Sequence, residues 1–204
     1  MAGQEINSDI KSAKAALRKS VLAARDALDP ALRAAASAAI TDALTALPAF
    51  TAARTVLAYA GFGSEIDTAP LLAATLATGK TLVLPRVDRA SRTLQLFVVR
   101  DLAADLVAGI WGIREPDPAR CPAADPDIIG FVLVPAVAFT QDSDRLGYGG
   151  GFYDQLIQKF RRRPLLITAG FALQMQPAVP VENTDQRVDG VITDRAAYGA
   201  ATAT

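Results

Sequence analysis

The segment that decides the fold reads DIIGFVLV at residues 127–134 and, after a short loop, DSDRLGYGGGFYDQLI at residues 142–157. The first run is the strongest buried-strand pattern in the chain, because it is almost continuously apolar. The second run passes through a glycine cluster into a helical pattern after Gly151. A strand, a glycine-rich loop and a helix in that order are typical of α/β proteins, whose ligands bind beyond the carboxyl ends of the strands.

Strands and helices alternate on both sides of this segment. Apolar residues at helical spacing predict helices, short apolar runs predict strands, and glycine and proline mark the ends. The expected helices lie at about 9–27, from after Asp29 to before Pro48, at about 68–78 and from after Gly151 to about 160. The expected strands lie at 55–60, at 81–84 where Pro85 stops the strand, at 93–99 as an edge strand, and at 127–134, 165–169 and 190–193. A mostly irregular stretch is expected at 101–126 and a frayed tail at 199–204.

This order of elements predicts the fold class. Alternating strands and helices favour an α/β, three-layer sandwich in which helices flank a central, mostly parallel sheet, as in Rossmann-like proteins. The chain has 204 residues and no internal repeat, which fits one domain of ordinary size. We therefore expect residues 1–204 to form a single domain.

The composition argues against several classes of partner. Lysine and arginine together number 21, as do aspartate and glutamate, so the formal net charge is zero. A weak overall field does not favour non-specific binding to nucleic acid or to a membrane surface. No apolar run approaches the ~20 residues that span a bilayer, and the N-terminus lacks the apolar core of a secretory signal. We expect a soluble, cytoplasmic monomer with small-molecule substrates and neither nucleic-acid nor membrane partners.

The chain contains no histidine and one cysteine, Cys121. Catalysis by Ser-His-Asp or Cys-His groups and zinc sites built on histidine are therefore excluded. Cys121 lies in the proline-rich run CPAADP without a histidine to activate it, and we interpret it as a loop or core residue. An enzyme with this composition would use carboxylates, cations and backbone amides, with or without a bound metal.

The glycine loop itself predicts an anion site. Gly147, Gly149, Gly150 and Gly151 allow successive amides to point into one concavity, and the following helix adds partial positive charge. Arg145 can supply a fixed fork of donors to phosphate, and Asp154 can cap the helix or hold a metal. The alternative is a flexible turn with a structural arginine. The glycine spacing fits neither a Walker A loop nor a GxGxxG fingerprint.

The run from Arg145 to Asp154, RLGYGGGFYD, resembles the signature of the 5-formyltetrahydrofolate cyclo-ligase family. Other stretches resemble that family in order and spacing, so the resemblance covers nearly the whole chain. They are the K-x-x-x-R pair Lys14 and Arg18, SEIDT at 64–68, LPR at 84–86, GIREP at 112–116, VPAVAF at 134–139, and the C-terminal element with Asp185, Val188, Asp189 and residues 191–193. Two positions depart from the family pattern: Phe152 replaces a tyrosine, and Thr184 replaces a frequent histidine.

The resemblance implies an activity. It implies an ATP- and Mg²⁺-dependent enzyme that closes the ring of 5-formyltetrahydrofolate to give 5,10-methenyltetrahydrofolate. ADP and phosphate are released, and the implied intermediate is a phosphorylated formyl group, an imidate. Phosphoryl transfer asks the protein mainly for alignment and charge stabilisation, which a chain without histidine can supply.

The resemblance also implies roles for individual residues. Arg145 is the implied catalytic residue, and carboxylates are suitable partners for Mg²⁺ beside phosphate oxygens. The implied ATP-binding residues are Lys14, Arg18, Arg145, Gly147, Gly149, Gly150, Gly151 and Tyr153; the implied substrate-binding residues are Glu65, Trp111, Pro135, Tyr148 and Phe152; and the implied metal ligands are Asp154 and Asp185.

Several of these residues also have simpler interpretations. Lys14 and Arg18 fit a solvated basic face of a helix, Glu65 fits an acid that precedes a helix, and Asp185 fits an ordinary loop aspartate. The cations at 159–163 fit a solvated helix C-terminus. Two other functions stay open: a non-catalytic, nucleotide-binding regulatory module that binds ATP without folate, and an enzyme of a related scaffold acting on phosphosugars.

Overall fold

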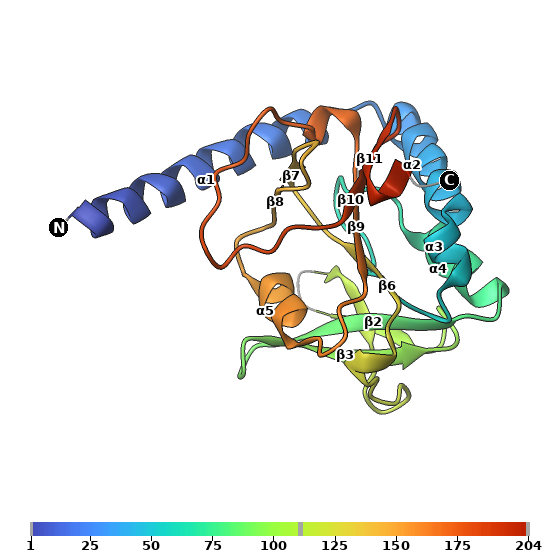
Figure 1. Ribbon diagram of the computed structural model, residues 1–204. Coiled ribbons are helices and arrows are strands. Elements are labelled where there is room, and N and C mark those ends of the chain that lie inside the picture. Colours follow the sequence, from blue (N-terminus) through green and yellow to red (C-terminus); the bar gives the residue numbers. More distant parts are fainter. Residues whose placement is uncertain (1, 110–111, 203–204) are drawn as a thin grey trace.

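A computed structural model of the chain describes residues 2–109 and 112–202. Its centre is a seven-stranded sheet in the order β11-β10-β9-β6-β1-β2-β3 (Figure 1). The five inner strands run parallel to one another, and only the edge strands β3 and β11 are antiparallel to their neighbours. The strands of this sheet are β1 Thr55–Leu57, β2 Thr81–Asp88, β3 Thr93–Val99, β6 Phe131–Val134, β9 Leu165–Ala169, β10 Gly190–Ile192 and β11 Ala197–Gly199.

Helices cover both faces of this sheet (Figure 1). The pleat of β1 sends Val56 into one core, with Ile40 and Phe50, and Leu57 into the other, with Leu156. The predicted three-layer α/β sandwich is therefore confirmed. The helices on the first face are α2 Pro30–Ala46, α3 Pro48–Ala52 and α4 Ala69–Ala77; the opposite face carries α5 Phe152–Lys159; and short 3-10 turns are η2 Pro126–Ile128, η3 Ala172–Gln174 and η4 Ala200–Thr202.

The first helix, α1 Ala2–Asp26, starts earlier than predicted and extends away from the rest of the molecule at its N-terminal end (Figure 1). Its C-terminal half is packed, because Val21 is buried in a small core with Val137 and Leu146. Within 2–109 and 112–202, no helix is both long and apolar enough to cross a membrane.

The prediction that Pro85 stops its strand is wrong, because β2 continues to Asp88. The inner neighbour β1 pairs with β2 only as far as Val83, whereas β3 pairs with β2 along its whole length, including Pro85 opposite Leu96. Beyond Val83 the strand therefore has a partner on one side only. A proline, which lacks an N–H donor, is tolerated where one side of a strand is unpaired.

Two predicted strands are shorter in the structure. The strand expected at 127–134 begins only at Phe131, because Asp125 accepts a hydrogen bond from the amide of Asp127 and caps the turn η2. The strand expected at 55–60 ends at Leu57, and the residues that follow it line a cavity. Both differences concern ends of elements and leave the order of the sheet unchanged.

Two small hairpins and the C-terminal end were not predicted correctly. β4 Leu106–Ala108 pairs with β5 Arg114–Pro116 inside the stretch expected to be mostly irregular, and β7 Ala138–Phe139 pairs with β8 Arg145–Leu146 in the expected loop. The tail expected to fray is ordered through η4, where Ala201 is buried. The cause is the pairing of β11 with β10, which ties the tail to the sheet.

Candidate active site

A cavity of about 860 Å³ opens beyond the carboxyl ends of β1, β2 and β6. Its wall combines α1, the glycine loop at 147–151, the start of α5 and a loop at 182–185. Open α/β sheets place their ligands at this end of the strands, and the volume falls in the range of small-molecule sites. The fold therefore brings segments from both ends of the chain to one site.

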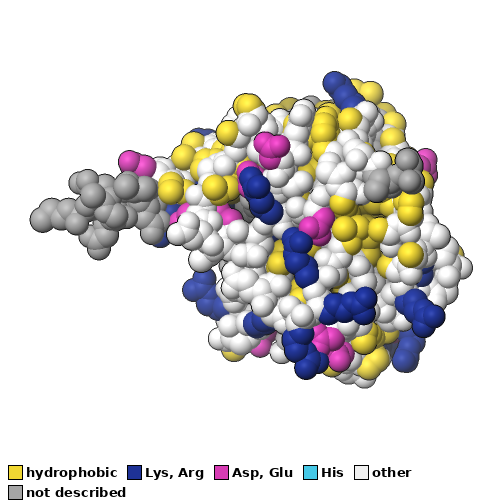
Figure 2. Space-filling model, in the orientation of Figure 1, with side chains coloured by type: hydrophobic (Ala, Val, Ile, Leu, Met, Phe, Trp, Pro, Cys, Tyr) yellow, Lys and Arg dark blue, Asp and Glu magenta, His cyan; other side chains and the backbone are white. Residues whose placement is uncertain are grey.

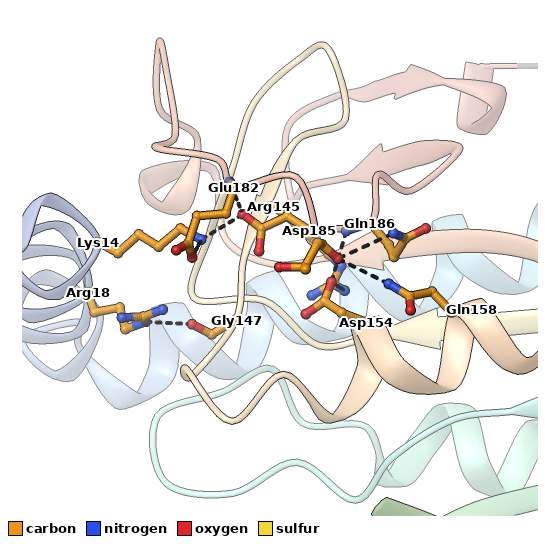
Figure 3. Close-up of polar contacts among 10 residues, drawn as sticks. Lys14, Arg18, Arg145, Gly147, Asp154, Gln158, Glu182, Asp185 and Gln186 are labelled. Atoms are coloured by element: carbon orange, nitrogen blue, oxygen red, sulfur yellow. Dashed lines mark hydrogen bonds and ion pairs between the residues drawn. The ribbon is translucent and has the colours of Figure 1, made fainter. Parts of the chain in front are cut away.

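The glycine loop needs glycine at two positions for its backbone conformation. Gly149 and Gly151 have φ angles of +101° and +67°, a region that L side chains rarely adopt. A Cβ on Gly149 would also lie 3.4 Å from the guanidinium carbon of Arg18. Arg18 Nε donates to the carbonyl of Gly147 at 2.8 Å (Figure 3). The loop, the arginine and the N-terminus of α5 together form a concavity suited to an anion.

The short hairpin β7–β8 carries Arg145 into the cavity wall. The side chain is 7% exposed, and its Nη2 donates to Asp154 Oδ1 at 2.6 Å (Figure 3). Its Nε is buried with no hydrogen-bond partner within the described residues. Burial lowers the pKa of Arg145, while the charges of Asp154 and Asp185 act in the opposite direction. Arg145 is thus a fixed cation with an unused donor at the cavity.

Lys14 of α1 reaches the same cavity from the other side. It is 5% exposed, and its ammonium donates to Glu182 Oε2 and Asp185 Oδ2, each at 2.6 Å (Figure 3). Burial acts to lower the pKa of Lys14, but the hydrogen bonds to both carboxylates outweigh it and the pKa is raised. The interpretation of Lys14 as a solvated cation is therefore wrong.

The two aspartates predicted as metal ligands flank Arg145 and line the cavity. Asp154 Oδ1 accepts from Arg145 and from the amide of Gln186, and Asp185 Oδ2 accepts from Lys14 and from the amide of Glu182. Each carboxylate keeps a second oxygen outside these bonds. Across the part of the chain that the structure describes, no group of three or more His, Cys, Asp or Glu side chains could hold a metal.

Glu65 lies in the loop after β1 and is 8% exposed. Its Oε1 accepts from the Tyr148 hydroxyl at 2.6 Å, and its Oε2 accepts from the amide of Phe62 at 3.0 Å. Burial raises the pKa of Glu65, although these two hydrogen bonds and the charge of Arg25 oppose the shift. An exposed aromatic pair stands beside it: the centroids of the Phe62 and Tyr148 rings are 5.3 Å apart. The site therefore pairs a recessed carboxylate with aromatic surface.

The remaining predicted residues are placed as follows. Pro135, Phe152, Gly150 and Tyr153 all line the cavity, and the hydroxyl of Tyr153 is buried without a hydrogen-bond partner in the described chain. Burial raises the pKa of Tyr153, so its phenol is neutral. Trp111 lies outside the described residues. Every described residue of the predicted set, from Lys14 to Asp185, therefore borders one cavity.

Two other features of the sequence lie outside this site. Arg161 and Arg163, which follow the end of α5 at Lys159, form ion pairs with Asp127 and Asp189 at the surface. Basic side chains on the face in Figure 2 have acidic neighbours in several places. Cys121 is buried, and burial raises the pKa of its thiol. These observations agree with the interpretation of solvated cations and a structural cysteine.

Two residues were not predicted: Glu182, which lines the cavity, and Arg25, which lies behind it in contact with Tyr148. Glu182 shares Lys14 with Asp185, and Arg25 donates to the hydroxyl of Tyr148. A signal existed for Arg25, because positions 14, 18 and 25 recur at whole turns and lie on one face of a helix. For Glu182 the sequence offers no comparable signal, since the surrounding loop has no regular period.

The fold and the site define a class: an α/β protein in which a cationic glycine loop and a recessed carboxylate with aromatic neighbours share one cavity. The model of the 5-formyltetrahydrofolate cyclo-ligase family matches residues 10–194, and the chain belongs to this family. The family resemblance, which was first indicated by the glycine-loop signature, is therefore confirmed over nearly the whole chain.

Individual relatives agree with this assignment. The chain is 32% identical to 5-formyltetrahydrofolate cyclo-ligase of Mycolicibacterium smegmatis, covering 89% of this chain and 94% of the relative. It is 30% identical to the Escherichia coli K12 protein of the same name, covering 72% and 81%. The NMR structure of Aquifex aeolicus 5,10-methenyltetrahydrofolate synthetase superposes with a TM-score of 0.81 at 30% identity, covering 94% of each chain.

Proposed function

We propose that this chain is an ATP-dependent cyclo-ligase that converts 5-formyltetrahydrofolate to 5,10-methenyltetrahydrofolate. One observation carries the proposal. Tyr148, a residue of the glycine loop, donates its hydroxyl hydrogen to Glu65 at 2.6 Å. The anion-binding loop and the recessed carboxylate are thereby joined within one cavity, so a nucleotide phosphate and a folate ring can meet there.

The nucleotide half of the cavity is the glycine loop with its cations. Arg145, Lys14 and Arg18 place positive charge around the loop amides, and Arg145 Nε is a buried donor without a partner in the described residues. We assign these groups, with Gly147, the glycines at 149–151 and Tyr153, to the ATP phosphates. Fixed donors aimed at the transferred phosphoryl group lower the barrier by electrostatic stabilisation, and Arg145 is the residue that we propose acts on the reacting phosphate.

A bound Mg²⁺ fits the carboxylates only in part. Asp154 and Asp185 each keep one carboxylate oxygen outside the hydrogen bonds of the cavity wall. Two carboxylates do not make a complete cage, and Mg²⁺ commonly completes its octahedron with water and substrate phosphates. We propose that these two residues hold Mg²⁺ when it arrives with ATP. The ion would neutralise the negative charge of the β- and γ-phosphates.

The folate half of the cavity is built around Glu65. The pterin ring presents neighbouring amide and amino hydrogens, and an ionised carboxylate can accept both. Phe62 and Tyr148 provide aromatic surface beside this carboxylate, and Pro135 and Phe152 line the same cavity. We assign Glu65, Pro135, Tyr148, Phe152 and, from the sequence, Trp111 to the folate substrate.

For the chemistry, we propose the steps that the family resemblance implies. The N5-formyl oxygen attacks the γ-phosphorus and the bond to the β-γ bridging oxygen breaks, which releases ADP. The formyl carbon of the resulting imidate phosphate is then attacked by N10, which loses its proton. The carbon–oxygen bond breaks, phosphate leaves and the five-membered ring closes. The protein contributes alignment of the two substrates and stabilisation of charge.

The cavity must exchange ion pairs to bind ATP. Lys14 and Arg145 are already bonded to carboxylates at 2.6 Å. Phosphate oxygens compete with Asp185, Glu182 and Asp154 for these cations. A metal bound to the carboxylates would reduce that competition, so we expect ATP and Mg²⁺ to bind with positive coupling.

A turnover assay tests this proposal. The purified chain is mixed with 5-formyltetrahydrofolate, ATP and Mg²⁺, while near-ultraviolet absorbance of the methenyl product and release of ADP are followed together. We expect equimolar product and ADP, and no product when ATP or metal is omitted. Binding of ATP with neither folate binding nor turnover would favour the regulatory module instead.

We also propose that residues 1–204 form a single domain and that the protein is a cytoplasmic monomer. The seven-stranded sheet, which uses strands from Thr55 to Gly199, supports the single domain. Light scattering coupled to size-exclusion chromatography measures the mass directly. A mass near the 21.4 kDa of the chain is the expected result, and twice that mass would contradict it.

A further inference from the structure

Arg25, near the end of α1, is a buried cation with no assigned role. It is 3% exposed, and its Nε donates to the hydroxyl of Ser64 at 3.0 Å. Its Nη2 donates to the hydroxyl of Tyr148 at 2.8 Å, and its guanidinium lies 5.8 Å from the centre of the Tyr148 ring. Burial of an arginine is costly unless its donors are paired, so this arrangement is a built feature of the site.

The hydrogen bonds from Arg25 to Glu65 have one direction. A phenol has a single hydrogen, and the arginine can only donate, so the Tyr148 oxygen accepts from Arg25 and gives its hydrogen to Glu65 Oε1 at 2.6 Å. The amide of Phe62 holds the other carboxylate oxygen. The carboxylate is thereby fixed by two donors, one of which is itself held by a buried cation.

Ser64 completes the link between α1 and the loop of Glu65. Its hydroxyl accepts from Arg25 Nε and donates to Asp26 Oδ1. Arg25 and Asp26, neighbours on α1, therefore hold the residue that precedes Glu65. On the same helix, Arg18 contacts the glycine loop. One rigid helix thus supports the anion loop through Arg18 and the recessed carboxylate through Arg25.

We infer that Arg25 is a positioning residue that acts through Tyr148 to fix the orientation and the negative charge of Glu65, and so determines affinity for folate and not for ATP. The inference rests on the proposed function, because it takes Glu65 as the partner of the pterin ring. Arg25 does not line the cavity itself, so its effect on substrate must pass through its neighbours.

The charges around Glu65 give the expected sign. The groups that face it are Arg25 of α1, Tyr148 of the glycine loop, Tyr153 of α5 and Tyr59 after β1. Arg25 is the cation among them and opposes the effect of burial on the pKa of Glu65. Without it the pKa of Glu65 rises further, so the carboxylate is neutralised at a higher pH and loses an acceptor for the pterin donors.

A double-mutant cycle tests this route. Steady-state kinetics are measured for Arg25→Gln, Tyr148→Phe and the double variant, with Lys19→Gln as a matched loss of charge at an exposed site of the same helix. We expect Arg25→Gln to raise the folate KM about tenfold, the scale of a hydrogen bond to a charged group, with the ATP KM changed less than about twofold. In the Tyr148→Phe background the same substitution should add less than about twofold.

The pH profile distinguishes positioning from a merely structural role. As pH falls, the folate KM of Arg25→Gln should begin to rise at a higher pH than that of the unsubstituted protein. Arg25→Lys, which keeps the charge, should restore this profile in part. If Arg25→Gln does not fold in thermal denaturation, the cycle is completed with Arg25→Lys, and the expectation of non-additivity with Tyr148→Phe is the same.

Several outcomes would overturn the inference. Equal rises in the folate and ATP KM values, an unshifted pH profile, or additive effects of Arg25 and Tyr148 would each do so. Its failure is distinguishable from failure of the proposed function. If the unsubstituted protein makes no methenyl product, the proposed function fails; if it turns over normally and Arg25→Gln matches Lys19→Gln, only the role of Arg25 fails.

Discussion

Lys14 and Asp185 lie 171 positions apart in the sequence, yet the lysine ammonium donates to Asp185 Oδ2 at 2.6 Å. Glu182 accepts a second bond from the same ammonium at 2.6 Å. The pair joins α1 to a loop near the C-terminus and closes one side of the cavity. Because this lysine is buried and already paired, a nucleotide can take its charge only in exchange for a carboxylate.

Removal of the lysine should therefore affect ATP more than folate. We expect Lys14→Gln to raise the KM for ATP about tenfold or more, because charge-assisted hydrogen bonds contribute about 1.5–3 kcal/mol. The folate KM should change less than about twofold. Steady-state kinetics with each substrate varied in turn measure both effects, with Lys19→Gln as the exposed control. A larger effect on folate than on ATP would contradict the assignment of Lys14.

Arg145 should be needed for turnover. We expect Arg145→Ala to lower kcat at least about 100-fold, the scale for loss of one electrostatic donor to a transition state. Asp154 keeps its bond from the amide of Gln186, so the fold should persist. Single-turnover kinetics and a thermal denaturation curve give the two measurements. Near-normal turnover in a folded variant would exclude the proposed phosphate role.

Gly149 should matter for function beyond its backbone conformation. Gly149→Ala introduces a Cβ at a φ of +101° and 3.4 Å from the Arg18 guanidinium. Gly79→Ala is the matched control, because Gly79 also has a positive φ, +73°, but has open space around its Cβ position. Each should cost about 1 kcal/mol of stability from strain, measured by denaturant unfolding. Only Gly149→Ala should weaken ATP binding; equal effects on ATP would count against the loop.

Glu65 should give folate binding its dependence on pH. Burial raises the pKa of Glu65, and the ionised form accepts the pterin donors. As pH falls through this raised pKa the carboxylate is neutralised, so the folate KM should rise on acidification. Glu65→Gln should weaken folate about tenfold or more at neutral pH and remove this rise, with ATP affinity unchanged. A variant that keeps the same pH profile would show that another group titrates.

Local patterns explain which parts of the fold could be predicted. The run at 127–134 and the glycine cluster at 147–151 are each contiguous in the sequence, so the sequence alone locates a buried strand followed by a glycine loop. The continuation of β2 past Pro85 could not be predicted from the sequence. It depends on the pairing of β1 with β2, which ends at Val83, and on the pairing of β3 with β2, which continues to Asp88. A proline restricts one side of a strand, and only the tertiary partners decide which side is paired.

The candidate site divides in the same way. The residues of the loop signature, from Arg145 to Asp154, were predictable as a set, and the structure places them around one cavity. The partners of Lys14 were not predictable, because Glu182 and Asp185 are remote from it in the sequence and lie in a loop that has no helical or strand periodicity. Arg25 was visible as a cation on the face of α1, but its bond to Tyr148 exists only once the helix packs on the loop.

The central claim is that the cavity holds both substrates so that the γ-phosphoryl group passes directly to the formyl oxygen. The most direct measurement uses 5-formyltetrahydrofolate labelled with oxygen-18 in the formyl group, followed by mass spectrometry of the phosphate released with ATP and Mg²⁺. The account predicts one labelled oxygen in each phosphate formed together with product. Unlabelled phosphate, with its fourth oxygen taken from water, would contradict direct transfer.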